Sequence, residues 1–167
     1  MNERDLDRTF AELTDLDRAD AAEIAVSLRE LLADVFTLYV KTKSFQWNMS
    51  ESHFHDYHLP LNQHSEQILA MTDTIAECGR KIGGTTLRSI GDIGRHQRLG
   101  DNDDEFVSPK EMLMELRQDN RELSRFLRST HDLCERLRDV ATAGLIERWI
   151  DETERRTWFL AATLSDL

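Results

Sequence analysis

Residues that break helices or form covalent links are scarce in this chain, which has only 2 Pro, 7 Gly and 2 Cys among 167 residues. Because Leu, Ala, Glu and Arg are frequent instead, the composition favours helices and predicts an all-α fold. Cys78 and Cys134 form no Cys-x-x-Cys pair. We therefore expect them to be the reduced, packed thiols of a cytoplasmic protein.

Long apolar runs and a positive net charge are also missing. No apolar run is long enough to span a bilayer, and residues 1–7 are charged and lack the apolar core of a signal peptide. The net charge is −11 and neither terminus is Lys-rich. Affinity for nucleic-acid phosphates comes largely from Lys and Arg, so direct DNA binding is disfavoured and no membrane contact is expected. In a closed oligomer the same charge would attract cations.

Length and composition fit a single globular domain, since 40% of the residues are hydrophobic and 32% are charged. We expect an N-terminal arm at residues 1–18 and one helical domain at residues 19–167. There is no internal repeat, low-complexity tract or domain linker.

Apolar residues spaced three and four apart predict the first two long helices. The first is expected to begin at an Asp20 cap and to end near Trp47. The second runs from about Phe54 to Lys81, and Gly83-Gly84 ends it in the way that helices commonly end.

A connection at residues 85–107 follows, which is long for a compact domain unless it crosses the fold. Its Leu87, Ile90 and Ile93 predict a short helix. Ser108-Pro109 predicts the start of a third long helix that ends near Leu137. Asp139 is expected to cap a fourth, whose apolar stripe comprises Leu145, Ile146, Trp149, Ile150, Trp158 and Phe159. Two short links around one long link are the connectivity of a ferritin-like four-helix bundle with a single crossover.

One polar stripe of the second helix carries the candidate chemistry. It comprises His58, Asn62, Glu66, Asp73 and Glu77. Within the stripe, His58 with Asn62 and Asp73 with Glu77 are pairs of potential metal ligands four residues apart. His58 and Asp73 lie about 22 Å apart along a helix, so no single ion bridges both pairs in one chain.

A second copy of the helix, packed antiparallel across a two-fold axis near Gln67 and Ile68, would bring the two pairs together. His58 of one chain would then face Asp73 and Glu77 of the other. An isologous interface makes two equivalent sites of this kind. The sequence therefore predicts a metal site that exists only in a dimer.

Imidazole and carboxylate ligands in a helical bundle suit iron or another first-row metal. Glu-x-x-His, the pair that ferritins bury inside each bundle, is absent from the chain. We therefore expect no di-iron centre within a single bundle.

Four segments together resemble the signature of the Dps family, the small ferritin-like proteins. They are Lys43-x-x-Gln46-Trp47-Asn48, Phe54-x-x-x-His58-x-x-x-Asn62, Asp73-x-x-x-Glu77 and Gly83-Gly84. The likeness covers about residues 28–84 by motif, and the remainder by helix length and order.

The resemblance implies a hollow shell of twelve subunits that oxidises Fe(II), preferably with hydrogen peroxide rather than oxygen, and stores the ferric mineral. Removing iron and peroxide in this way would protect DNA. It also implies a ferroxidase site across the two-fold interface, with His58 as one ligand and Asp73 and Glu77 as the partner chain's carboxylates.

Two positions depart from the family pattern. Gln46 stands where the family has a His, and Asn62 where it has an Asp. An amide oxygen is a neutral, weaker ligand, so we expect lower iron affinity and slower oxidation. The alternative is an assembled shell whose oxidation site has lapsed and which serves as an iron store or scaffold.

His53, His55 and His64 crowd the same region. They would supply either a replacement ligand, an extra surface metal site or an ordinary exposed cluster, and we favour the last. His64 points nearly opposite Asn62 on a helical wheel. Trp47 is expected to pack beside the site, and a plain core tryptophan is the alternative.

Three carboxylates of the fourth helix, Glu147, Asp151 and Glu154, line up at steps of four and three. Around a three-fold axis they would line a pore that draws in cations. A solvated helix face is the alternative, and we favour it.

Overall fold

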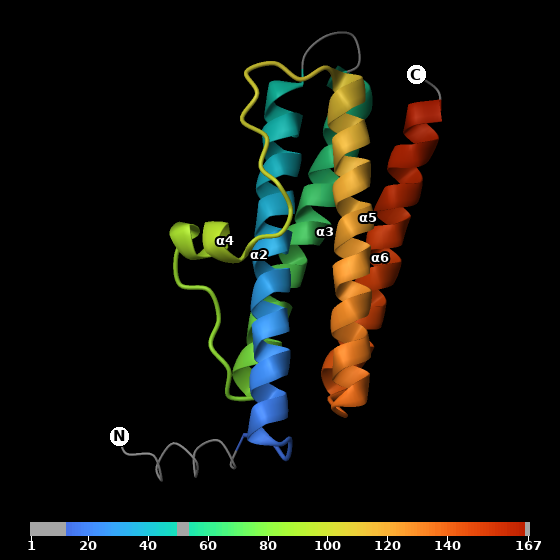
Figure 1. The fold of residues 1–167 in the computed structure, drawn as a ribbon. Helices are drawn as coiled ribbons and strands as arrows, with labels where there is room; N and C mark the ends of the chain where they lie inside the picture. Colours follow the sequence, from blue (N-terminus) through green and yellow to red (C-terminus); the bar gives the residue numbers. More distant parts are fainter. Residues whose placement is uncertain (1–12, 50–53, 166–167) are drawn as a thin grey trace.

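The computed structural model describes residues 13–49 and 54–165, and every regular element within them is a helix (Figure 1). The helices are α2 (Arg18–Asn48), α3 (Phe54–Lys81), α4 (Ile90–His96), α5 (Pro109–Arg136) and α6 (Val140–Ser165). Four are long and form the bundle, and the short α4 lies in the crossover between α3 and α5. The predicted all-α fold with one crossover is confirmed.

The start of α2 differs from the prediction. Asp17 rather than Asp20 is the N-cap: its side chain accepts a hydrogen bond of 2.9 Å from the Ala19 backbone N–H. Asp17 has an extended backbone, with ψ 142°, as a capping residue requires. Asp20 instead lies in the first turn, where its negative charge interacts favourably with the positive end of the helix dipole. Most of the arm predicted at residues 1–18 lies outside the described residues.

Local sequence signals set the other long helices as predicted. Gly83 has a φ of 83°, and its N–H and that of Gly84 bond to the carbonyls of Arg80 and Gly79, which is the Schellman ending of a helix. At the start of α5, Ser108 and Glu111 form a reciprocal capping box.

The turn between α5 and α6 uses the same ending without a glycine. Arg138 has a φ of 65°, its N–H bonds to the Glu135 carbonyl, and the Asp139 N–H bonds to the Cys134 carbonyl. Asp139 then caps α6 as predicted, because its Oδ1 accepts from the Thr142 N–H at 3.1 Å. An arginine therefore holds a left-handed conformation that favours glycine.

The crossover runs alongside α2, and its short helix α4 lies on the outside of the bundle (Figure 1). α4 begins after the Ser89 cap, so Leu87 precedes the helix instead of sharing its face. Leu87 packs on the core, whereas Ile90 is 84% exposed. The predicted short helix exists, but its three apolar residues do not form one buried stripe.

The core fills the space between the four long helices, where α2 packs on α3 and α5 packs on α6. Trp149 and Ile146 of α6 are buried, but Trp158 is 69% exposed and Phe159 is 36% exposed. These two members of the predicted apolar stripe therefore do not face the core, whereas the next residue, Leu160, is fully buried.

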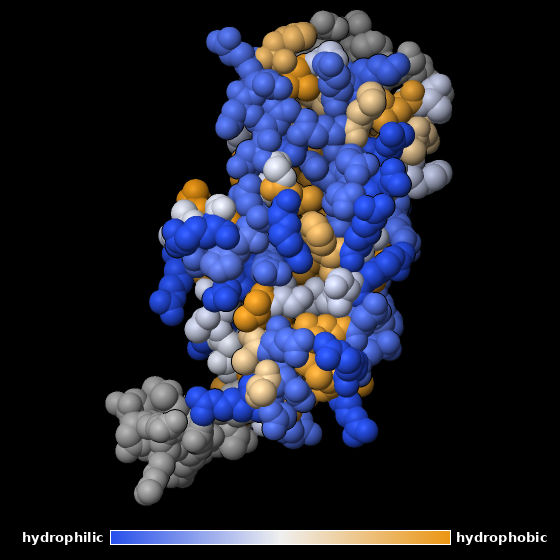
Figure 2. Space-filling model, in the orientation of Figure 1, coloured by the Kyte–Doolittle hydropathy of each residue, from blue (hydrophilic) through white to orange (hydrophobic). Residues whose placement is uncertain are grey.

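The face seen in Figure 2 is mainly hydrophilic, with scattered hydrophobic patches. No helix of the described residues is long and apolar enough to cross a membrane. Cys78 and Cys134 are free and buried, as predicted. Burial raises the pKa of both thiols, that of Cys134 to about 12.

Candidate metal site

Gln46, His58 and Asn62 meet where the end of α2 lies beside the start of α3. Gln46 is 3% exposed, and His58 and Asn62 are half-buried. Gln46 Nε2 lies 3.3 Å from His58 Nε2 and donates to Asn62 Oδ1 at 3.2 Å. The three residues that the sequence assigned to one end of the site are therefore in mutual contact.

Lys43 completes this cluster one turn earlier on α2. Its ammonium donates to Gln46 Oε1, and to Asn62 Oδ1 at 3.1 Å. Asn62 in turn donates from Nδ2 to Glu66 Oε1 at 2.6 Å. Both amides thus have fixed orientations, and their oxygens face a positive charge.

Asp73 and Glu77 lie further along α3, and both are exposed. Among residues 13–49 and 54–165, no three His, Cys, Asp or Glu side chains lie close enough to hold a metal ion. The chain by itself presents His58 with two amides at one place on α3 and two solvent-facing carboxylates at another. How two copies meet stays a prediction.

Trp47 follows Gln46 in the last turn of α2 and is 67% exposed. This is not the position of a core tryptophan. The Lys43 Nζ atom lies 5.6 Å from the centroid of its ring, a cation–π contact that places Trp47 beside the cluster.

The neighbouring histidines do not add a described ligand. His53 and the side chain of His55 lie outside the described residues. His64 is buried on another side of α3, where its ring meets Phe159 of α6 edge-on at 5.2 Å between centroids. Burial, followed by the Arg156 guanidinium, lowers the pKa of His64 to about 4. The prediction of an exposed histidine cluster is therefore wrong for His64, which belongs to the α3–α6 contact.

The three carboxylates predicted for a pore are exposed on α6, and each has a cationic or ionisable neighbour in the same chain. Glu147 lies 3.4 Å from His131, Asp151 accepts from Arg155 at 2.8 Å, and Glu154 accepts from Arg128. All six side chains except that of His131 are more than half exposed. Such pairs are weak and leave the carboxylates open to solvent cations.

Comparison with known proteins decides the family. Residues 26–167 match the family model of the ferritin-like domain. This chain belongs to the ferritin-like family. Within it, relatives named DNA protection during starvation protein place the chain in the Dps group.

The relatives align over most of their length. A low temperature-induced protein of Nostoc sp. strain PCC 7120 is 30% identical over 134 residues, which cover 80% of this chain and 75% of the relative. DNA protection during starvation protein 1 of Deinococcus radiodurans is 23% identical over 151 residues, which cover 90% of this chain and 73% of the relative.

Solved structures share the fold. DpsC from Streptomyces coelicolor matches with a TM-score of 0.87 and 22% identity, over 90% of this chain and 88% of that one. An archaeal Dps homologue from Halobacterium salinarum matches with a TM-score of 0.85 and 24% identity, over 90% and 83% of the two chains.

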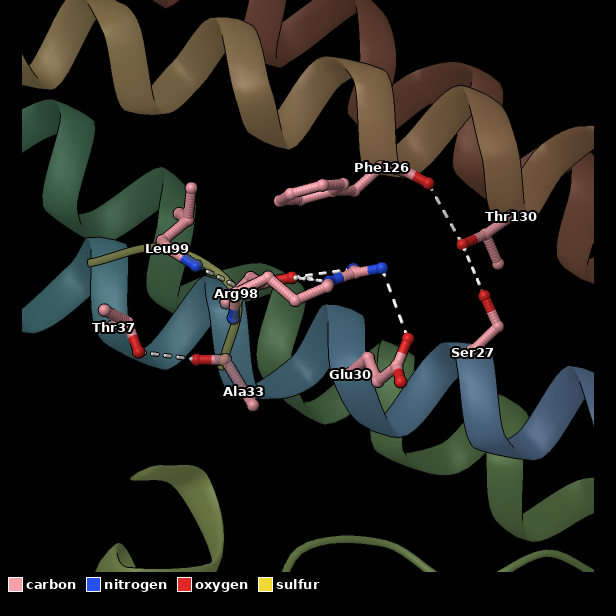
Figure 3. A network of polar contacts seen from close by, with 9 residues as sticks. Ser27, Glu30, Ala33, Thr37, Arg98, Leu99, Phe126 and Thr130 are labelled. Carbon is pink, nitrogen blue, oxygen red and sulfur yellow. Dashed lines mark hydrogen bonds and ion pairs between the residues drawn. The ribbon is translucent and has the colours of Figure 1, made fainter. Parts of the chain in front are cut away.

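The sequence did not predict a group of polar contacts that attaches the crossover of this Dps-like chain to α2 (Figure 3). We call the contacts of Asp34 with Arg98 and Leu99 the polar clasp. Asp34 is fully buried in α2. Its Oδ1 accepts from the backbone N–H groups of Arg98 and Leu99, and its Oδ2 accepts from the Arg98 guanidinium at 2.7 and 2.8 Å. The guanidinium also stacks 3.9 Å from the centre of the Phe126 ring. A lone Asp within the apolar run of residues 31–35 was the available signal.

The sequence also did not predict a buried cluster of charged side chains that joins α2 to α5. Lys41 is buried and its ammonium lies 2.7 Å from Glu115 and 2.8 Å from Asp119. Burial lowers the pKa of Lys41 but the two carboxylates raise it, and the net shift is upward. For Asp119, burial raises the pKa more than Lys41 lowers it. These contacts connect the middle of α2 to α5.

Proposed function

We propose that the protein takes up Fe(II), oxidises it at sites formed between two copies of the chain, and stores the ferric product inside a hollow shell, thereby protecting DNA from iron and peroxide. The observation that carries this proposal is the contact of Gln46, His58 and Asn62 at one end of a polar stripe whose other end bears Asp73 and Glu77. Membership of the Dps group supports the same reading, because relatives carry the name of DNA protection during starvation.

In the proposed assembly, two α3 helices lie antiparallel across a two-fold axis. His58 supplies a neutral imidazole nitrogen, and Asp73 and Glu77 of the other copy supply anionic oxygens. This donor set suits Fe(II) and is better still for Fe(III), since carboxylate oxygens favour the higher charge. Each of two Fe(II) ions gives one electron to hydrogen peroxide, whose O–O bond breaks to form two waters after two protons are taken up.

Oxidation and assembly are tested separately. Light scattering should show a large closed oligomer, for which the family resemblance predicts twelve subunits, and anaerobic Fe(II) titration should show saturable sites, two per dimer. His58→Ala should abolish saturable binding and peroxide consumption without changing the particle size. Peroxide consumption that survives His58→Ala would refute this site, and a protein that stays monomeric would refute the shared site altogether.

A second function has an observation of its own. The Gln46 and Asn62 oxygens already bind the Lys43 ammonium, so a metal ion at either oxygen would meet that positive charge. Under this reading the shell assembles but no longer oxidises iron, and acts as an iron store or scaffold. The absence of saturable Fe(II) binding in a fully assembled particle would favour it.

A further inference from the structure

The last part of the crossover, residues 101–106, is acidic and ends in an exposed aromatic ring. Its sequence is Asp-Asn-Asp-Asp-Glu-Phe, which carries four carboxylates and no cation. Within residues 13–49 and 54–165, none of these carboxylates takes part in an ion pair. Phe106 is 70% exposed. We call residues 101–106 the acidic loop, and it presents unpaired negative charge next to an apolar ring.

Two hydrogen bonds hold the acidic loop in shape. Asn102 Nδ2 donates to Glu115 Oε2 of α5 at 2.7 Å, and the Asp104 N–H donates to Asn102 Oδ1 at 3.0 Å. The second bond makes a turn in which an asparagine side chain takes the place of a backbone acceptor. A loop that is already ordered loses less conformational entropy when it docks. The acidic loop is therefore suited to fit a fixed surface.

A groove of about 320 Å³ lies between α5 and α6. Its apolar part is formed by Trp158, which is 69% exposed, and by Ala161 three residues later. The small side chains of Ser124 and Thr157 lie beside them and leave room for a ring. Tryptophan is among the residues that most often anchor contacts between proteins. The groove therefore has the room and the anchor for an apolar side chain of a partner.

The rim of the groove is positively charged. Arg121 and Arg125 of α5 and Glu154 of α6 line it. Glu154 accepts from Arg128, and Arg125 pairs with Glu122 at 2.9 Å, so these charges are already balanced. Arg121 is exposed and has no ion pair among the described residues. The groove therefore favours an acidic partner, because its own balance of charge is positive.

The acidic loop and the groove lie on different sides of the same chain. Residues 104–107 lie against the end of α2 and the start of α5. Figure 1 shows the crossover beside α2, whereas α6 forms the opposite edge of the bundle. From Pro109 to Arg121 the axis of α5 rises about 18 Å. The acidic loop is held at the first turns of α5, so it cannot fill the groove of its own chain.

We propose that the groove between α5 and α6 receives the acidic loop of a second copy of this chain. Phe106 of the second copy packs against Trp158, and the loop carboxylates face Arg121 and Arg125. The two halves match in both respects, since an apolar ring flanked by negative charge meets an apolar groove with a positive rim.

The contact joins two different surfaces, so it is heterologous and passes from copy to copy until a ring closes. The two-fold contact of the proposed function is isologous and by itself stops at a dimer. A larger particle needs a second kind of contact, which the acidic loop and the groove supply. This inference rests on the shell of the proposed function but not on its iron chemistry.

Charge reversal on each half tests the contact by light scattering. Arg121→Glu with Arg125→Glu should reduce the large particle to dimers, and so should Asp103→Lys with Asp104→Lys. The variant that combines all four changes should regain the large particle, because both halves are reversed together. Arg136→Glu with Arg148→Glu reverses two exposed arginines outside the groove and should keep the wild-type size.

The apolar half has its own variants. Phe106→Ser and Trp158→Ser should each give dimers, whereas Val40→Ser, at an exposed apolar residue of α2, should not. Circular dichroism should show wild-type helix content in all of them. A large particle in either half variant would overturn the proposal, as would a four-change variant that stays dimeric. Dissociation of the groove variants alone would mean that another surface fills the groove.

Failure of this contact and failure of the iron site are distinguishable by anaerobic Fe(II) titration. A wild type that binds Fe(II) at saturable sites but stays a dimer would refute the contact and keep the site. A large wild-type particle without saturable Fe(II) binding would refute the site, and the charge reversals would still decide the contact. Dimers of the half variants should bind Fe(II) as the wild type does, because the groove lies away from His58.

Discussion

Asp34 and Arg98, which lie 64 residues apart in sequence, form an ion pair of 2.7 Å inside the protein and fasten the crossover to the middle of α2. Thr37 adds a hydrogen bond of 3.2 Å to Gln97, and Arg98 reaches Glu30 at 3.3 Å. The crossover is therefore attached to α2 along about two turns of one helix face.

Asp34→Asn should lower the free energy of unfolding by about 3 kcal/mol, since it removes one partner of a buried, hydrogen-bonded charge pair. Thermal or urea unfolding at fixed protein concentration would measure this. The control is Arg148→Met, which breaks the exposed pair with Glu152 and should leave the midpoint nearly unchanged. An Asp34→Asn variant as stable as the control would contradict the stabilising role of the clasp.

Arg138→Gly should raise the stability by about 0.5–1 kcal/mol, because glycine adopts the φ of 65° without the strain that an arginine side chain suffers. Gly83→Ala, at a φ of 83°, should shift the stability the other way by a similar amount. Paired denaturation curves would show both effects. Equal midpoints for Arg138→Gly and the wild type would mean that the turn bears no strain.

Lowering the pH should reduce the stability of the folded protein, because His64 is buried in its neutral form. Its pKa is about 4 in the folded state and 6.5 when exposed, so the unfolded chain binds a proton that the folded chain refuses between these values. The free energy of unfolding should therefore fall by up to about 3 kcal/mol as the pH drops from 6.5 to 4. His64→Leu should remove this part of the pH dependence. Parallel stability profiles for the two proteins would exclude His64 as a source.

Iron uptake should slow when Asp151 and Glu154 become Asn and Gln, if these carboxylates line a pore in the assembled shell. The measurement is the rate of Fe(II) disappearance at low ionic strength, where electrostatic attraction is strongest. Glu122→Gln combined with Asp132→Asn removes the same number of charges from α5 and serves as the control. An unchanged uptake rate would leave the three α6 carboxylates as a solvated face.

Local signals explain why the sequence predicts most of the fold. The capping box at Ser108, the glycine pair at residues 83–84 and the Asp139 cap each act within a few residues, and the structure confirms all three. The same reasoning misplaced the first cap, because Asp17 and Asp20 are residues of the same type and both precede the apolar pattern of α2 closely.

Contacts between distant segments explain what the sequence did not predict. Lys41 meets Asp119 across 78 residues, and periodicity gives no sign of such pairing. The site itself was partly accessible, since helical spacing paired His58 with Asn62 and the resemblance to the Dps signature added Gln46. The part that Lys43 plays was hidden, because its donor role becomes visible only when both amide oxygens are seen to face it.

The fully buried Asp34 also bears on how the chain folds. A hairpin of α2 and α3 can form from neighbouring sequence, but its Asp34 must stay hydrated until Arg98 arrives to neutralise it. Once the crossover places Arg98 beside Asp34, the carboxylate is neutralised. The second hairpin, α5 with α6, can then pack against α2 without burying an unpaired charge. Docking of the two hairpins should accordingly depend on the Asp34 and Arg98 side chains together.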